Sequence, residues 1–177
     1  MEPKELMTKR RIEKLASEYE NNRISIKTDD FNENDRYDVF VSHSSADNEF
    51  IRKVLLFLKY AKGGIQGYVD WQDPSLQHPT NADTAVVLKK RIRRARKLIY
   101  VVTNDSLKSV WCSWELGFAD SDKGINNIAI LAIKPNNGYW KNNEYIQQYP
   151  WILYDNSLFK VILPNGNSMT LYEWLKK

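Results

Sequence analysis

Trp111 and Glu115 lie four residues apart in a stretch, residues 110–118, that is otherwise mainly apolar and aromatic. If this stretch is helical, the two side chains share a face one turn apart. A carboxyl group desolvated beside an indole has a perturbed pKa, which suits a residue that takes part in a reaction. The alternative, which the pattern alone favours, is that Trp111 is a core residue and that Glu115 caps a helix or pairs with an arginine. The spacing leaves both interpretations open.

A second candidate is the basic run at residues 89–97, in which seven of nine residues are lysine or arginine. Such a run can form a nucleic-acid-binding patch. It can also be the solvated face of a helix whose apolar stripe is Ala85, Leu88, Ile92 and Ala95, with basic charge near the C-terminal end, where the helix dipole favours it. We favour the solvated helix.

One cysteine and two histidines limit the remaining chemistry. A single cysteine, Cys112, excludes an internal disulfide and a cysteine metal cluster, and two histidines argue against a zinc site, so we expect no metal. Cys112 has no histidine near it in sequence and is predicted to be a packed apolar residue, not a nucleophile. His78, between Gln77 and Pro79, is predicted to be a loop residue, whereas His43 is predicted to line a pocket.

The elements that must position these residues alternate between strand and helix from Tyr37 onwards. Runs of β-branched and aromatic residues predict buried strands at residues 37–42, 68–70, 97–103, 128–133 and 151–154. Apolar residues at helical spacing predict helices at residues 50–61, 85–95 and 106–119. Thr170 and Glu173 resemble a capping box that opens a short C-terminal helix.

Glycine and proline mark two interruptions in this alternation. Gly63 and Gly64 are predicted to end the first helix after residue 61. Residues 71–81 contain Pro74 and Pro79 and are predicted to form a long loop.

The alternation predicts an α/β fold, a flavodoxin-like doubly wound parallel sheet of about five strands. In such a sheet the ligand binds outside the carboxyl ends of the strands. Those ends carry residues 42–45, 70–71 and 103–104, so a site is expected to be built there. The first strand is not followed by a G-x-G-x-x-G sequence, which argues against a dinucleotide-binding dehydrogenase or a P-loop NTPase.

Residues 1–36 differ from the rest in being highly charged and poor in apolar residues. Ile12, Leu15 and Tyr19 allow one amphipathic helix, followed by a polar linker. We therefore divide the chain into an N-terminal extension, residues 1–36, and a domain at residues 37–177. The extension is predicted to be a solvated lead-in; the alternative is a helix that docks on this domain or on a copy of it.

The composition agrees with one globular domain. The chain has 177 residues, 42% of them hydrophobic, and a formal net charge of +4, an excess too small to imply nucleic acid or membrane binding. No apolar run approaches the roughly 18 residues that a membrane span needs. The charged N-terminus shows no secretory signal, so we expect a cytoplasmic protein.

Four pieces of this sequence, in order, resemble a TIR (Toll/interleukin-1 receptor) domain. They are residues 37–47, residues 68–71 with the proline-containing loop that follows, residues 92–103, and the segment from Ser109 to Gly117. The last piece contains Trp111 and Glu115 and matches the W-x-x-x-E pattern of bacterial TIR enzymes. The resemblance covers residues 37–133 well and the remainder loosely.

The resemblance implies cleavage of NAD⁺ at the nicotinamide–ribose bond, with NAD⁺ as substrate and no cofactor. Glu115 falls on the family's catalytic glutamate. The positions that fall on substrate-binding parts of the family are His43, Ser44, Ser45, Asp70, Trp71 and Trp111. Relatives that carry basic residues after the first strand differ from this chain, which has Ser44 and Ser45 there.

A single carboxylate is chemically sufficient for this reaction. Glycoside hydrolysis ordinarily needs one acid to protonate the leaving oxygen and a second carboxylate opposite it. Nicotinamide in NAD⁺ is already a cationic pyridinium and leaves as a neutral molecule without protonation. One anionic group that stabilises the oxocarbenium-like transition state can suffice, and either water or a group within the ligand can capture C1′.

The resemblance further implies a role in bacterial antiphage signalling, like that of the stand-alone TIR subunit of Thoeris systems, where the nucleotide product activates a separate effector protein. From the length we expect no attached effector domain. Partners implied are NAD⁺, further copies of the chain through TIR–TIR contacts, and the effector, with no nucleic acid and no membrane. The alternative is a non-catalytic TIR adaptor that acts by homotypic assembly.

Overall fold

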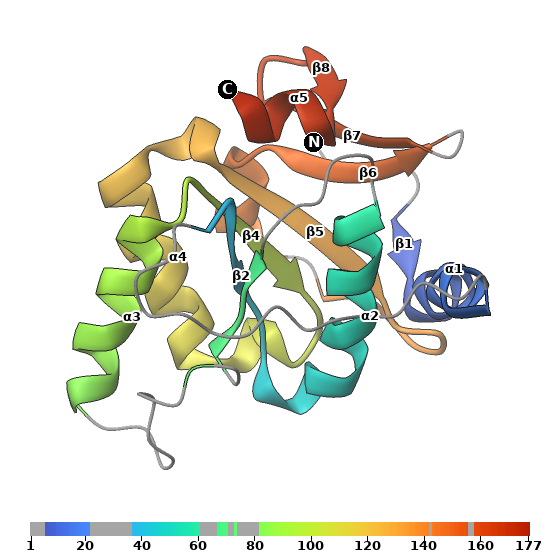
Figure 1. Cartoon of the computed structure of the whole chain (residues 1–177), viewed down its shortest axis with the longest axis horizontal. Coiled ribbons are helices and arrows are strands. Elements are labelled where there is room, and N and C mark those ends of the chain that lie inside the picture. Colours follow the sequence, from blue (N-terminus) through green and yellow to red (C-terminus); the bar gives the residue numbers. More distant parts are fainter. Residues whose placement is uncertain are drawn as a thin grey trace.

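The computed structural model describes residues 6–21, 37–60, 67–70, 73, 82–141, 143–155 and 158–177. Within these residues, a central and mostly parallel β-sheet lies between two layers of helices (Figure 1). Of the predicted long loop at residues 71–81, Asp73 is described and the rest lies outside the described residues. The glycines predicted to end the first helix, Gly63 and Gly64, also lie outside them. No helix in the described part of the chain is both long and apolar enough to cross a membrane.

The parallel part of the sheet has the predicted flavodoxin-like order. In the described residues its strands are β2 (Val39–Ser42), β3 (Gly67–Tyr68), β4 (Lys97–Val102), β5 (Ile128–Lys134) and β6 (Trp151–Asp155). They lie side by side in the order β3-β2-β4-β5-β6, which is 2-1-3-4-5 in chain order. The predicted strands are confirmed, although β3 begins one residue earlier than expected and ends two residues earlier. It ends early because the chain turns at Asp70, whose carbonyl accepts from the Asp73 amide at 3.0 Å.

Helices cover both faces of this sheet. The helices α1 (Lys9–Asn21), α2 (Asn48–Tyr60) and α5 (Leu171–Lys176) pack in one core, and α3 (Ala82–Arg94) and α4 (Val110–Lys123) pack in the other. Alternate strand residues serve the two cores: Ile99 and Val101 face the first, whereas Tyr100 and Val102 face the second. Because every strand residue of β4 is buried, the sequence there is continuously apolar or aromatic after Lys97.

The N-terminal segment is part of the core, which corrects the prediction of a solvated lead-in. The strand β1 (Met7–Thr8) pairs in parallel with the end of β5, and α1 packs against α2. Ile12 and Ala16 on α1 are fully buried. The alternative, a helix that docks on this domain, is confirmed, because Ile12 and the partly buried Leu15 pack into the first core. The division of the chain at residue 36 stays a prediction.

The C-terminal part adds strands that the sequence analysis did not predict. The strands β7 (Leu158–Ile162) and β8 (Ser168–Thr170) extend the sheet beyond β6 in antiparallel fashion. The predicted capping box of α5 is confirmed: the Glu173 amide donates to Thr170 Oγ1 at 3.2 Å, and the Thr170 amide donates to Glu173 Oε2 at 2.8 Å.

Candidate active site

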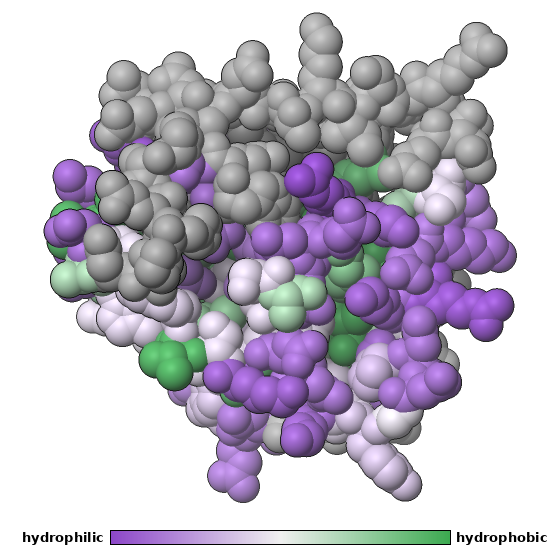
Figure 2. Space-filling model, turned by 90° about the horizontal axis from the view of Figure 1, so that it is seen from below, coloured by the Kyte–Doolittle hydropathy of each residue, from purple (hydrophilic) through white to green (hydrophobic). Residues whose placement is uncertain are grey.

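The carboxyl ends of β2 and β4 and the N-terminal ends of α2 and α4 lie together at the lower side of the molecule in Figure 1. Figure 2 views this side and shows, outside the grey atoms, a largely hydrophilic surface with small separate hydrophobic patches. The predicted site residues that the structure describes lie on elements that meet at this side. This is the edge at which doubly wound sheets bind their ligands.

Glu115 is buried under this side, on the inward face of α4. The helix is capped by Ser109, whose side chain accepts from the Cys112 amide at 3.3 Å. Cys112, Leu116 and Ala119, which share the inward face, belong to the core, and this places Glu115 against the sheet with 6% of its surface exposed. Within the described part of the chain, its hydrogen-bond partner is Ser42 at the end of β2, whose hydroxyl donates to Glu115 Oε2 at 2.6 Å.

Burial raises the pKa of Glu115 to about 8. The hydrogen bond from Ser42 opposes this rise, and the negative charge of Asp70 adds to it. A carboxyl group placed among apolar side chains without a cation destabilises a fold when it ionises. Among the described residues, the capping role and the arginine partner that the sequence allowed for Glu115 are not found.

Trp111 stands one turn before Glu115, at the start of α4, and is partly buried against the same core. Its ring meets Trp114 edge to face with the centroids 5.6 Å apart, and Trp114 stacks on Phe118 at 5.8 Å. A row of aromatic rings from Trp111 to Phe118 therefore runs along α4, the helix that carries the buried carboxyl group.

His43 and Asp70 face one another across the ends of β2 and β3. The His43 Nε2 atom lies 3.5 Å from Asp70 Oδ1 and 3.2 Å from Asn48 Oδ1, and Nδ1 lies 3.0 Å from the Val41 carbonyl oxygen. A carbonyl oxygen only accepts, so Nδ1 carries a proton that it donates to Val41. The ring is therefore oriented with Nε2 toward the two side-chain oxygens, and its own side chain is only 2% exposed.

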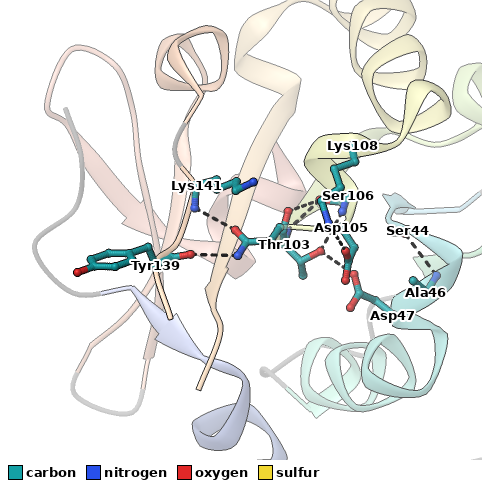
Figure 3. A network of polar contacts seen from close by, with 10 residues as sticks. Ser44, Ala46, Asp47, Thr103, Asp105, Ser106, Lys108, Tyr139 and Lys141 are labelled. Atoms are coloured by element: carbon teal, nitrogen blue, oxygen red, sulfur yellow. Dashed lines mark hydrogen bonds and ion pairs between the residues drawn. The ribbon is translucent and has the colours of Figure 1, made fainter. Parts of the chain in front are cut away.

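Ser44 and Ser45 begin the short helix η1 (Ser45–Asp47) that follows β2. The Ser44 hydroxyl accepts from the Ala46 amide at 3.3 Å and so caps this helix, whereas Ser45 is exposed. Asp47 accepts from Thr103 Oγ1 at 2.6 Å, which ties this segment to the end of β4 (Figure 3).

Asn104 extends the same network to the segment after β5. Its amide nitrogen donates to the Tyr139 carbonyl at 3.0 Å, and its Oδ1 accepts from the Lys141 amide at 2.9 Å (Figure 3). Together with the Thr103–Asp47 bond, these contacts connect the segments that follow β2, β4 and β5.

Trp71 and His78 lie outside the described residues, so their predicted places stay predictions. Ser42 lies at the strand end where the sequence predicted a site, but its role as the partner of Glu115 was not predicted. Asn48, which contacts His43, was missed altogether. No signal in the sequence singled it out.

The remaining candidates occupy structural positions. Cys112 is buried, which confirms the prediction of a packed residue. Burial raises the pKa of its thiol to about 12, which disfavours the nucleophilic thiolate. Within the described residues, no group of three or more histidine, cysteine, aspartate or glutamate side chains could hold a metal ion.

The basic run is not uniformly solvated, which corrects the expectation for residues 89–97. Arg91 is 2% exposed, and its Nε contacts Asp73 Oδ2 at 2.7 Å. Lys97 is 3% exposed, and its Nζ donates to Asn127 Oδ1 at 2.5 Å. The sequence could not show this burial because both partners come from segments distant along the chain. The run's other lysines and arginines are exposed.

Comparison with known proteins agrees with this geometry. The family model described as "TIR domain" matches residues 39–157. A Bacillus cereus (strain MSX-D12) protein named "Probable 3' cyclic ADP-D-ribose synthase ThsB'" is 32% identical over 127 residues, which cover 69% of this chain and 63% of that protein. A Cytobacillus dafuensis protein named "Putative cyclic ADP-D-ribose synthase TIR2" is 37% identical over 86 residues, which cover 47% of this chain and 22% of that protein.

Among solved structures, the TIR domain of the Toll-related receptor TRR-2 from Hydra magnipapillata aligns with a TM-score of 0.44 and 22% identity, covering 62% of this chain and 78% of that one. The chain spans less than two thirds of the length of either of the two relatives named above. A buried acid at the carboxyl edge of a 2-1-3-4-5 sheet, together with the family match over residues 39–157, establishes the class: this chain belongs to the TIR domain family.

Proposed function

We propose that this chain cleaves the nicotinamide–ribose bond of NAD⁺ and transfers the ADP-ribose either to water or to a hydroxyl group of the same molecule. The observation that carries the proposal is the buried Glu115, held by Ser42 at the ligand-binding edge of the sheet. If the residue at position 115 only had to pack against the core, an apolar side chain there would make the fold more stable. The names of the two relatives, both cyclic ADP-ribose synthases, support the same reaction.

In the proposed reaction, the bond between C1′ and the nicotinamide nitrogen breaks, and its electron pair stays with nicotinamide, which leaves as a neutral molecule. The ionised Glu115 stabilises the positive charge that develops on the ribose. The oxygen of water or of a hydroxyl group then bonds to C1′ and releases its proton. The residues proposed to bind the substrate are His43, Ser44, Ser45, Asp70, Trp71 and Trp111.

The raised pKa of Glu115 fits this role. In the free protein near neutral pH the group holds a proton, because its pKa is about 8. A cationic nicotinamide ring bound beside it favours the ionised form. As the bond to C1′ breaks, the positive charge moves from the ring to the ribose, and a carboxylate beside the ribose stabilises this transition state more than the bound substrate.

A cyclic product is the form that the relatives' names support. We propose that it acts in the bacterial cytoplasm as an antiphage signal that activates a separate effector protein, and that the chain self-associates through TIR–TIR contacts. A non-catalytic adaptor would share these contacts but would have no use for a buried acid at the ligand edge.

Purified protein incubated with NAD⁺ and followed by mass spectrometry tests the reaction. We expect release of nicotinamide together with cyclic or linear ADP-ribose. Removing a single group that stabilises charge in a transition state costs about 10²- to 10³-fold in rate, and we expect that loss for Glu115→Gln, which keeps the side-chain volume. The matched control is Glu144→Gln, which removes an exposed carboxylate and should turn over NAD⁺ like wild type.

If Glu115→Gln is folded and consumes NAD⁺ at the wild-type rate, the assignment of Glu115 as the catalytic group is wrong. If wild type itself consumes no NAD⁺ under any condition, the adaptor becomes the better interpretation. The comparison is made at concentrations at which wild type measurably consumes NAD⁺, because an assembling enzyme can be silent when dilute.

A further inference from the structure

A buried polar cluster of Tyr68, Asp73 and Arg91 lies beside the candidate site and is not explained by the proposed reaction. The Arg91 and Asp73 side chains are 3% and 0% exposed, and Arg91 Nε lies 2.7 Å from Asp73 Oδ2. The Tyr68 hydroxyl donates to the same oxygen at 2.9 Å. Burial, together with the neighbouring Asp73, raises the pKa of Tyr68, so its hydroxyl remains a donor.

This cluster holds Asp73 in one place. A buried ion pair is tolerated only when its geometry is good and further hydrogen bonds satisfy its atoms, which both donors to Asp73 Oδ2 provide. The donors come from different elements, Tyr68 from β3 and Arg91 from α3. Asp73 is therefore fixed between the end of a strand and a helix packed on the sheet.

Asp73 is connected to the candidate site through its backbone. Its amide donates to the Asp70 carbonyl at 3.0 Å and closes the turn after β3. At the start of that turn, the Asp70 carboxylate lies 3.5 Å from His43 Nε2, and it is 36% exposed. Because the Asp70 carboxylate is partly exposed, its position beside His43 depends on the conformation of the turn that carries it.

We propose that Arg91 and Asp73 are positioning residues that hold the turn after β3, and thereby keep the Asp70 carboxylate against His43 at the candidate active site. The consequence for NAD⁺ binding rests on the proposed function, whereas the contact between Asp70 and His43 does not. The two parts are therefore tested by separate measurements.

The test variant is Arg91→Gln, and its matched control is Arg93→Gln. Both remove a guanidinium group from α3, and both break an ion pair, since Arg93 Nε lies 3.2 Å from Asp122 Oδ1. The Arg93 pair is exposed and belongs to α3 and α4, so its loss leaves the turn after β3 untouched. A double variant, Arg91→Met with Asp73→Leu, fills the same space with apolar groups and provides the test if Arg91→Gln does not fold.

The first measurement follows the imidazole resonances of His43 by NMR, which needs no enzymatic activity. The chain has two histidines, so in a His78→Gln background the one remaining imidazole is His43. We expect its ring resonances to move in Arg91→Gln, or in the double variant, in the same direction as in Asp70→Asn, and to stay at the wild-type position in Arg93→Gln. Wild-type resonances in a folded Arg91→Gln or double variant would overturn the proposal.

The second measurement is steady-state NAD⁺ cleavage, which extends the proposal to the substrate. Misplacing a binding group by about 1 Å can cost up to about a hundredfold. We therefore expect kcat/KM of Arg91→Gln, or of the double variant, to fall about tenfold or more, mainly through KM. Arg93→Gln should match wild type. A loss confined to kcat, or equal losses in Arg91→Gln and Arg93→Gln, would show that Arg91 does not position the substrate site.

The two measurements separate this proposal from the proposed function. If wild type cleaves no NAD⁺ under any condition but the His43 resonances respond as expected, the proposed function fails and the positioning role stands. If wild type cleaves NAD⁺ and the resonances do not respond, the positioning role fails alone.

Discussion

At the scale of single residues, Glu115 is the feature that packing does not explain. Its carboxyl group is enclosed by core residues, its hydrogen bond comes from a neutral serine, and burial raises its pKa to about 8. Such a group lowers the stability of the fold at neutral pH, and groups of this kind cluster at functional sites. Two consequences of the raised pKa can be measured, one on stability and one on activity.

The first prediction concerns the stability of Glu115→Gln as pH rises. Between the ordinary pKa of 4.5 and the folded-state value of about 8, the folded chain keeps a proton that the unfolded chain has lost. The free energy of unfolding of wild type therefore falls with rising pH by about 1.4 kcal/mol per pH unit from this group. Glutamine does not titrate, so the variant gains on wild type from about pH 5 to pH 8, and the gain then levels off.

Urea unfolding at several pH values between 5 and 9 measures this difference. Taking the difference between the two proteins cancels the titration of all other groups. Glu144→Gln, which removes an exposed carboxylate, serves as the control and should differ from wild type by a small, nearly constant amount. A gain that is the same at every pH would mean that Glu115 is not desolvated in the folded protein.

The second prediction concerns the pH dependence of NAD⁺ cleavage. The reaction needs ionised Glu115, and kcat/KM reports ionisation in the free enzyme. Because the pKa of Glu115 is raised to about 8, kcat/KM should rise about tenfold per pH unit below that value and level off above it. Initial rates at low NAD⁺ between pH 6 and pH 9.5 measure it, with enzyme-free blanks for spontaneous loss of NAD⁺. A flat profile would exclude an ionised Glu115 as the required form.

At the scale of elements, the N-terminal strand and helix are a structural part of the domain. The strand β1 continues the sheet along the carboxyl half of β5, while β6 pairs with Ile130 nearer its beginning. The helix α1 then covers α2, with Lys9 over the Phe50 ring at 5.2 Å. A short segment ahead of the family match thus completes one core of the sheet.

The third prediction tests the contribution of α1 to stability. Ile12 is fully buried in the core shared by α1, α2 and the sheet. Ile12→Ala should therefore lower the free energy of unfolding by about 2–5 kcal/mol, because it removes buried methyl groups and leaves a cavity. Lys14→Ala, at an exposed position two residues further along the same helix, should change it by less than about 0.5 kcal/mol.

Chemical denaturation of the three proteins gives these values directly. Equal effects of the two substitutions would show that α1 does not pack on the domain in solution, and would restore the solvated lead-in that the charged sequence suggested.

At the scale of the whole molecule, the fold concentrates polar groups from distant segments at one edge of the sheet. Ser42 reaches Glu115 across 73 residues, and Thr103 reaches Asp47 across 56. The antiparallel strands β7 and β8 extend the sheet beyond β6. The helix α5 follows them, and its Trp174 indole donates to the Asn126 carbonyl, just before β5, at 2.9 Å. The candidate chemistry therefore lies at one edge of the sheet.

The fourth prediction concerns self-association of the chain. If TIR–TIR contacts complete the substrate site, NAD⁺ turnover per protein molecule should increase with protein concentration. We predict that residues 71–81, which follow Asp70 in the chain and lie mostly outside the described residues, respond to this association. Loops beside a site commonly control enzyme activity.

A dilution series over three decades of protein concentration, with light scattering on the same samples, measures both turnover and mass. Constant turnover per molecule across the series would contradict the prediction and would mean that one copy of the chain is sufficient.

The sequence by itself determined the order of strands and helices and the position of its most informative acid. These depend on local patterns: apolar runs such as residues 128–133, helical spacing, and the capping box at Thr170 are each visible within a few residues. The strand β7 could also have been predicted, because Phe159, Val161 and Ile162 are aromatic or β-branched residues in a short run, whereas β1 is too short for any pattern to show.

Only the tertiary structure decided which residues meet. The pairing of Ser42 with Glu115, the burial of Arg91 against Asp73, and the packing of Ile12 on the core all join segments whose separation along the chain carries no signal. Periodicity states that a side chain faces inward, but its partner depends on which strands are neighbours and on their register. For the same reason the sequence left Glu115 open between a cap, an ion pair and a reacting group. Its environment was resolved by its burial, with no cation paired to it among the residues that the structure describes.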